Sequence, residues 1–159
     1  MDLAYATELS LEQYALFESL LQPHYTTGRP PSVSLMHVFQ AILYVLVSGC
    51  AWRLLPHEYP PYSTVYYYFR KWRQDGSWKR IHDHLVQWVR VVEAHEASPS
   101  AASLDSQTVP TAVMVHQAVG DDGGKKIKGR KSFTLVDTLG LLLAVRVVAG
   151  NVPEREGAK

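Results

Sequence analysis

The stretch Leu35-Met-His-Val-Phe-Gln-Ala-Ile-Leu-Tyr-Val-Leu-Val47 decides how the first half of this chain folds. Its apolar side chains recur at the i, i+3, i+4, i+7 spacing of an amphipathic helix. They are Leu35, Val38, Phe39, Ile42, Leu43, Leu46 and Val47. Ser32 or Ser34 is expected to begin this helix, and Gly49 is expected to end it. The pattern therefore predicts one helix with one buried face.

A further helix is expected before this stretch. Ser10 followed by Gln13 has the spacing of a capping box, in which the two residues satisfy each other's backbone N–H groups. An apolar stripe follows, made of Leu11, Tyr14, Phe17, Leu20 and Leu21. The segment from Pro23 to Pro31 contains Gly28 and is expected to be a loop.

Two more helices are expected after an irregular, proline-containing connector at residues 51–62. The third helix begins near Ser63 or Thr64 and ends near Gly76. One of its faces carries Val65, Tyr68, Phe69 and Trp72. The fourth helix follows Ser77, and its inward positions are Trp78, Ile81, Leu85, Trp88, Val89 and Val92.

Beyond residues 94–103, which are small and polar, the pattern changes to that of strands. Ala102–Val109 is expected to be a short strand. Phe133–Thr138 and Leu141–Val148 are expected to be two strands joined by a tight turn at Leu139-Gly140. The sequence therefore predicts an α+β protein, with a helical domain at residues 1–95, a linker at 96–103 and a second domain at 104–159.

Composition indicates a globular protein with local basic patches. The 159 residues are 47% hydrophobic, which is enough for a packed core. The net charge is only +1, yet residues 51–90 hold seven basic side chains against three acidic ones. The single cysteine, Cys50, has apolar neighbours and is expected to be a small buried residue. No signal peptide or membrane-spanning run is visible, so a soluble cytoplasmic protein without membrane partners is expected.

One side of the third helix combines aromatic and basic residues. They are Tyr66, Tyr67, Arg70, Lys71 and Arg73. The third and fourth helices, separated by Asp75-Gly76, resemble a helix-turn-helix layout, so these side chains could contact duplex DNA in its major groove. The alternative is a solvated helix face whose long side chains cover apolar surface, with the tyrosines mostly in the core.

A lone carboxylate, Asp105, lies on the first expected strand. A rigidly held carboxylate suits a Mg²⁺ ligand in two-metal phosphoryl transfer. The alternative is an ordinary strand-end or turn residue. Asp137 precedes the tight turn and is expected to serve that turn, whereas Asp121 and Asp122 are expected to be loop residues.

A basic run follows Asp105 at an interval of about twenty residues. It comprises Lys125, Lys126, Lys128, Arg130 and Lys131, with Gly124 and Gly129. Glycines allow close approach of the backbone to a phosphate, and the crowded cations favour an anionic partner; the alternative is a solvated loop. The histidines show no spacing typical of metal ligands, so no zinc site is predicted.

Several stretches, in the same order, resemble transposases of bacterial insertion sequences of the DDE, RNase H-like class, in the insertion-sequence-five family. The matching stretches are Ala41–Pro56, Thr64–Trp72, Asp105–Val109, Gly123–Lys131 and Leu135–Leu143. The resemblance implies a helical domain that helps to recognise the element's ends, followed by the start of an RNase H-like catalytic domain.

The resemblance also implies roles for individual residues. Asp105 matches the first carboxylate of the DDE triad and would be a Mg²⁺ ligand. Lys125–Lys131 would lie in the hairpin between the first two strands and touch DNA. The second Asp and the Glu of the triad have no counterpart in these 159 residues, and Ser132 and Phe133 stand where relatives carry a basic residue and a His.

The first hypothesis is therefore a transposase polypeptide that binds the terminal inverted repeats of its element but is catalytically incomplete alone. Its partner would be double-stranded DNA, together with a C-terminal transposase polypeptide or a second copy, in the bacterial cytoplasm at the nucleoid. The alternatives are a non-enzymatic DNA-binding regulator of transposition and an inactive remnant.

Overall fold

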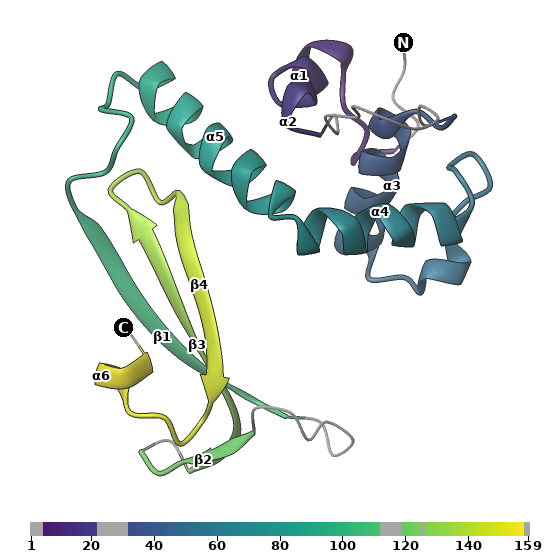
Figure 1. The fold of residues 1–159 in the computed structure, drawn as a ribbon. Coiled ribbons are helices and arrows are strands. Elements are labelled where there is room, and N and C mark those ends of the chain that lie inside the picture. The colour runs from purple at the N-terminus through teal and green to yellow at the C-terminus, as the bar shows by residue number, and fades with distance from the viewer. Residues whose placement is uncertain (1–4, 22–31, 112–118, 125, 158–159) are drawn as a thin grey trace. The chain divides into compact units, whose positions relative to one another are not determined.

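A computed structural model describes residues 5–21, 32–111, 119–124 and 126–157, and shows helices followed by an antiparallel sheet (Figure 1). The chain divides into two compact units, Met1–Leu85 and Val86–Lys159. The predicted α+β class is confirmed at this level. This division falls inside the helix at residues 77–92, whereas the sequence predicts a linker at residues 96–103. Whether the chain folds as two domains joined by that linker stays a prediction.

The helices before the sheet are α1 (Leu11–Ala15), α2 (Glu18–Leu21), α3 (Leu35–Ser48), the 3₁₀ turn η1 (Trp52–Leu54), α4 (Tyr62–Gln74) and α5 (Ser77–Val92). Capping residues mark the start of α1 and both ends of α3. The predicted capping box is confirmed, because Ser10 Oγ accepts the Gln13 N–H at 3.1 Å and Gln13 Oε1 accepts the Ser10 N–H at 2.9 Å. Ser34 Oγ caps α3, and Gly49 ends it at a φ of +66°, a conformation that favours glycine. The predicted loop at Pro23–Pro31 lies entirely outside the described residues.

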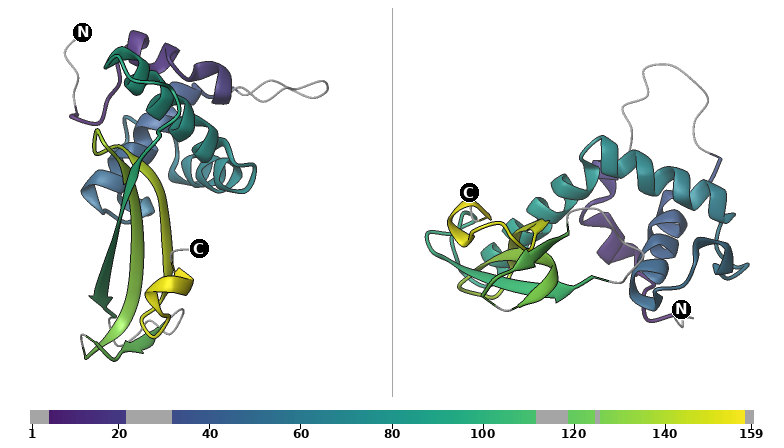
Figure 2. Two further views of the ribbon diagram at one scale, coloured as in Figure 1. Left: turned by 90° about the vertical axis from the view of Figure 1, so that its left-hand side faces the viewer. Right: turned by 90° about the horizontal axis from the view of Figure 1, so that it is seen from below.

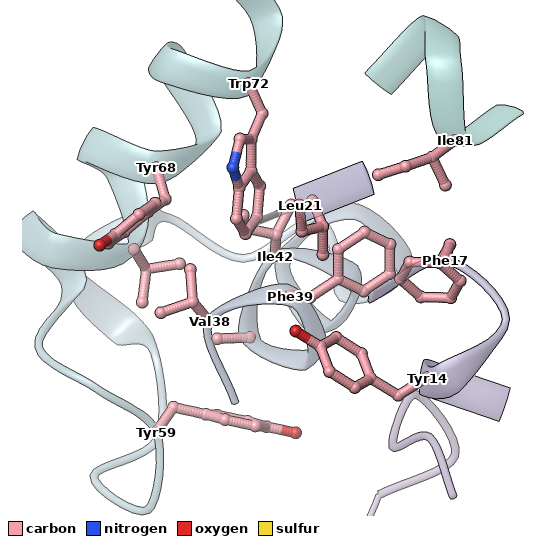
Figure 3. Close-up of a cluster of buried hydrophobic side chains, with 12 residues drawn as sticks. Tyr14, Phe17, Leu21, Val38, Phe39, Ile42, Tyr59, Tyr68, Trp72 and Ile81 are labelled. Carbon is pink, nitrogen blue, oxygen red and sulfur yellow. The ribbon is translucent and has the colours of Figure 1, made fainter. Parts of the chain in front are cut away.

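The core of the first unit is formed where α3 packs on α4 (Figure 3). Val38 and Ile42 from α3, and Val65 from α4, are completely buried, and Trp72 is 2% exposed. α1 and the segment after it add Tyr14, Phe17 and Leu21. Fully burying an aliphatic or aromatic side chain of this size stabilises a fold by about 1.5–3 kcal/mol. This packing therefore fixes the rotation of α3 and α4 about their own axes.

Some residues predicted to be inward are exposed. Leu46 and Val47 are 59% and 76% exposed, and Val45, which was not in the predicted stripe, is buried instead. The last turns of α3 are apolar on more than one side, so spacing alone does not select the buried side. Leu11 is 77% exposed because the predicted stripe is divided between the two short helices α1 and α2.

Two side chains of α5 and the cysteine also differ from expectation. Trp88 and Val92 are 43% and 60% exposed, although their spacing continues the apolar stripe of Ile81 and Leu85. Cys50 is half-buried rather than buried. No helix in the described ranges is both long and apolar enough to cross a membrane.

The second unit is built around one long central strand. Its elements are β1 (Ala102–Pro110), β2 (Gly120–Asp122), β3 (Ile127–Asp137), β4 (Leu142–Ala149) and α6 (Glu154–Gly157). β3 pairs antiparallel with each of the other three strands. The three predicted strands are confirmed, but β3 begins at Ile127 instead of Phe133. The short strand β2 was not predicted, so Asp121 and Asp122 are strand residues and not loop residues.

The pairing register assigns side chains to the two faces of this sheet. Asp105, Thr134 and Val145 lie in one row across β1, β3 and β4, and therefore share a face. Phe133 belongs to the opposite face, where it is 3% exposed. α6 lies against that opposite face (Figure 2), and a Cβ added at Gly157 would come within 2.0 Å of the Phe133 ring. The short helix thus depends on a glycine at this contact.

A buried ion pair ties the end of α5 to the turn after β3. Arg90 pairs with Asp137, and the two residues are 3% and 4% exposed. Arg90 Nε also donates to the Glu96 carbonyl at 2.8 Å. Asp137 Oδ1 accepts the N–H groups of Leu139 and Leu141 at 2.9 and 2.8 Å, which supports the predicted turn role. Burial alone would raise the pKa of the Asp137 carboxyl, but these donors together hold the pKa below its usual value.

Truncation of the α3–α4 contact should destabilise the first unit. Ile42→Ala removes completely buried methyl groups and leaves a cavity, so we expect a loss of about 2–5 kcal/mol in the free energy of unfolding. Leu46→Ala, on the exposed side of the same helix, should change it by less than about 0.5 kcal/mol. Chemical denaturation followed by tryptophan fluorescence measures both; equal losses would contradict the described rotation of α3.

The Arg90–Asp137 pair should make the second unit sensitive to acid. Because the pKa of Asp137 is lower in the folded than in the unfolded chain, its contribution is present above the unfolded value of about 3.9 and is lost as the pH falls through the folded value. Asp137→Asn should lower the thermal midpoint at neutral pH and flatten the acid part of the pH profile. Asp121→Asn, at an exposed strand position, is the matched control.

An unchanged acid profile in the Asp137→Asn protein, measured by circular dichroism melts, would show that this carboxylate does not stabilise the sheet.

Candidate functional site

The outward side of α4 is a surface whose orientation is set by the buried side of the same helix. Val65, Tyr68 and Trp72 hold the inward side in the core. On the outward side, Tyr66 and Tyr67 are 42% and 58% exposed. The structure thus brings the predicted aromatic and basic residues together on a helix whose orientation is fixed by packing.

Most of the predicted set lines one open hollow of about 440 Å³. Its lining residues are Ser63, Tyr66, Tyr67, Arg70, Lys71 and Gln74. Arg73 lines a second hollow of about 160 Å³, with Tyr66, Phe69, Arg70 and Gln74. Ser63, Phe69 and Gln74 were not among the predicted site residues. Helical spacing could have identified Gln74, because it lies one turn beyond Arg70.

The Tyr66 ring is held by an aromatic cluster. Its centroid lies 5.3 Å from that of Trp52 in an edge-to-face arrangement and 6.5 Å from that of Phe69. Trp52 and Phe69 contact each other as well, at 5.1 Å. Contacts of this kind contribute roughly 0.5–1.5 kcal/mol beyond area burial. Tyr66 is therefore anchored on one side and exposed on the other.

The surface is electropositive. α4 contains Arg70, Lys71 and Arg73 and no acidic residue. Lys71 Nζ lies 5.9 Å from the centroid of the Tyr68 ring, a cation–π contact that positions the ammonium group. Asp75, which follows α4, is engaged elsewhere: its Oδ1 accepts the Ser77 N–H at 2.9 Å and the Ser77 hydroxyl at 2.6 Å. Clustered cations on a rigid helix suit a polyanion.

Asp105 is exposed on β1, on the face that carries Thr134 and Val145. Within the described ranges, no three His, Cys, Asp or Glu side chains come close enough to hold a metal ion. The other carboxylates of this unit have separate roles, since Asp137 pairs with Arg90 and Asp122 faces Lys131. Asp105 can offer one oxygen donor to a cation, but the described residues do not surround it with others.

The basic residues at 125–131 do not share one surface, because side chains of β3 point alternately to the two faces of the sheet. Lys125 lies outside the described residues, and Lys126 is an exposed turn residue with a φ of +54°. Lys128 and Arg130 point to the same face as Asp105, because side chains alternate along β3 and Arg130 pairs with Val109. Lys128 is exposed and Arg130 half-buried. Lys131 points to the opposite face and is 8% exposed.

Lys131 belongs to a buried polar cluster with Asp122 and Thr108. Thr108 Oγ1 donates to Asp122 Oδ2 at 2.6 Å, and Lys131 Nζ lies 3.5 Å from the same oxygen. Lys131 Nζ also donates to the Val152 carbonyl at 3.4 Å, and the Gly124 N–H donates to Asp122 Oδ1 at 3.0 Å. The cluster joins β1, β2 and β3. One feature of the sequence could have indicated this cluster. Lys131 lies two residues before the apolar Phe133 on the same strand, so both side chains point to the buried face.

Comparisons with known proteins agree with the order of the two units. The family described as "Putative transposase of IS4/5 family" matches residues 9–82, and the family described as "Transposase DDE domain" matches residues 96–159. The chain is also similar to the "Insertion element IS402 uncharacterized 16.2 kDa protein" of Burkholderia cepacia. The two are 34% identical over 105 residues, which cover 62% of this chain and 69% of that protein. No solved structure matches the chain.

Loss of the Thr108 hydroxyl should destabilise the sheet. Thr108→Val removes the hydroxyl that donates to the buried Asp122 at 2.6 Å, so we expect a loss of roughly 1–3 kcal/mol in the free energy of unfolding. Thr134→Val makes the same chemical change on the face that carries Asp105 and should cost less. Urea denaturation checks the pair. Equal effects would show that the Thr108–Asp122–Lys131 cluster does not support the sheet.

Proposed function

Because the chain belongs to the IS4/5 family of insertion-element transposases, we propose that it acts in DNA transposition by binding the terminal inverted repeats of its element. The observation that carries this proposal is the outward side of α4. It presents Arg70, Lys71 and Arg73 beside exposed tyrosines, on a helix without acidic residues. An α-helix fits the major groove, and Arg and Lys neutralise phosphates.

The packing of α4 supports a role as a recognition helix. In helix-turn-helix proteins the second helix of the pair is the recognition helix in the major groove, and the first helix crosses the DNA backbone. Here α3 packs along α4, and α5 follows after the short break at Asp75-Gly76. In the predicted helix-turn-helix layout α4 and α5 are the pair, and the α3 contact offers α4 additional support. That layout would make α5 the second helix of the pair, whereas α4 is second to α3. The basic and aromatic side chains lie on α4, so the recognition role is assigned to α4.

The second unit is proposed to be the beginning of an RNase H-like catalytic domain. Its three longer strands are antiparallel, and Asp105 lies exposed on the first of them. By its motif position, Asp105 is the proposed first carboxylate of the DDE triad. Lys126, Lys128 and Arg130 are the proposed DNA contacts of this unit. Lys131 is left out of the set because its ammonium group faces Asp122.

A Mg²⁺ ion would supply Lewis acidity for strand cleavage and transfer in a complete DDE site. Asp105 is a suitable hard ligand, but within the described ranges it belongs to no group of three metal-ligating side chains. The residues present thus do not fit a two-metal site, and they support no catalytic step by themselves. We propose that residues 1–159 alone bind DNA without cleaving it, and that cleavage requires carboxylates from another polypeptide segment.

One alternative is a DNA-binding regulator that occupies the repeats without catalysis. It needs no metal site, and the described residues contain no group of three metal-ligating side chains. Adding a separately produced C-terminal transposase polypeptide distinguishes the two. Mg²⁺-dependent strand cleavage that appears on mixing, and is lost with Asp105→Asn, supports the transposase. Repeat binding without cleavage on mixing supports the regulator.

Binding itself is tested by salt titration with an inverted-repeat duplex and a scrambled duplex of equal length. The wild-type chain should prefer the repeat. Arg70→Ala/Arg73→Ala should abolish the preference. It should also lower the affinity for both duplexes and reduce the slope of log affinity against log salt, because a removed cation no longer releases counterions from a phosphate.

Lys79→Ala is the matched control, because this lysine is exposed on α5 and pairs with Asp83 at 2.5 Å. Equal, salt-sensitive binding of both duplexes by the wild-type chain would contradict end recognition and leave only non-specific attraction between cations and phosphates.

A further inference from the structure

Three residues of α4 form a ridge between the two hollows. Tyr66, Arg70 and Gln74 line both the 440 Å³ hollow and the 160 Å³ hollow. They are spaced at i, i+4 and i+8, so they follow one line along the helix surface. Lys71 lines only the larger hollow, and Arg73 lines only the smaller one. The ridge is therefore flanked by one cation on each side.

This arrangement matches the cross-section of a DNA groove. The major groove is about 12 Å wide, and a helix with its side chains is about 10–12 Å across. A helix inserted along its ridge would direct the ridge residues to base edges and the flanking residues to the two phosphate backbones. Gln74 is exposed and uncharged, so it adds little to the non-specific attraction between the protein and phosphates. Its side chain can contribute to DNA binding through directional hydrogen bonds.

We propose that Arg70 and Gln74 are the base-reading residues of this protein, and that Lys71 and Arg73 bind the phosphates that border the groove. This inference rests on the proposed function and assigns specificity within it. The planar guanidinium of Arg70 matches the O6 and N7 acceptors of guanine. The carboxamide of Gln74 matches the N7 acceptor and the N6 amino donor of adenine.

The helix geometry limits the spacing of the two bases. Residues four apart are separated by about 6 Å along an α-helix. Neighbouring base pairs are separated by about 3.4 Å along the duplex axis. The guanine read by Arg70 and the adenine read by Gln74 therefore lie within about two base pairs of each other.

Packing holds the ridge of α4 in a fixed orientation, as recognition of base edges requires. Tyr66 is held by Trp52 and Phe69, and the inward side of α4 is buried through Val65 and Trp72. Sites on rigid helices position side chains better than sites on loops. The hydroxyl of Tyr66 lies one turn before Arg70, and its removal in Tyr66→Phe keeps the aromatic packing.

The test is selection of duplexes with a randomised core by the full 159-residue chain and its variants. The wild-type chain should select a consensus with a guanine and an adenine within about two base pairs. Gln74→Ala should lose preference at the adenine alone, on the order of ten- to a hundredfold. Arg70→Ala should lose preference at the guanine. Lys71→Ala should keep the consensus and weaken binding to every duplex.

A matched control and a base analogue complete the design. Gln87→Ala makes the same change at an exposed position of α5 and should keep the wild-type consensus. Replacing the selected adenine by 7-deazaadenine, which lacks the N7 acceptor, should weaken wild-type binding but leave Gln74→Ala unaffected. Circular dichroism of each variant checks that the substitution has not unfolded the protein.

Two results would overturn the inference, and they are distinguishable. If Gln74→Ala and Arg70→Ala select the wild-type consensus, the ridge does not read bases, although the proposed end recognition stands. If the wild-type chain selects no consensus, the proposed end recognition fails, and the assignment of base-reading residues fails with it.

Discussion

The packing of α4 against α3 is the constraint on which the first unit depends. Burial of Val65 and Trp72 against Val38 and Ile42 sets the rotation of α4 about its own axis. A helix with one side fixed in a core must present the other side to its surroundings. The exposed tyrosines and cations of α4 are thus the consequence of an apolar contact on the opposite side, and a change in that contact would redirect them.

Alternation along β3 plays the equivalent role in the second unit. The strand carries Lys128, Arg130 and Lys131 in one short run, yet only the first two share the face of Asp105. Lys131 is turned inward with Phe133 and is compensated by Asp122. A buried cation needs such a partner, since an unpaired one would be costly to desolvate. The basic run is therefore divided between the face of Asp105, which carries Lys128 and Arg130, and the buried face, which carries Lys131.

The sequence predicted most helices, the main strands and the α4 set because each depends on a local pattern. The capping box at Ser10 and the left-handed end at Gly49 are examples. Tertiary packing decided the rest. Leu46 and Val47 continue an apolar run but find no neighbouring core, and β2 is too short to show a period. The role of Asp122 required the fold, because Thr108 and Lys131 reach it from distant positions in the chain. The roles of Asp105 and of the DNA-contacting residues remain predictions.

We propose that the outward side of α4 is the surface that meets DNA. Site-specific photo-crosslinking tests it most directly, with a photoreactive phenylalanine introduced at the exposed Tyr67 or, as the comparison, at the exposed His84 of α5. Irradiation with an inverted-repeat duplex should give a covalent protein–DNA adduct from position 67 and little from position 84. Adducts of equal yield from both positions, or from position 84 alone, would show that the outward side of α4 is not the DNA-contacting surface.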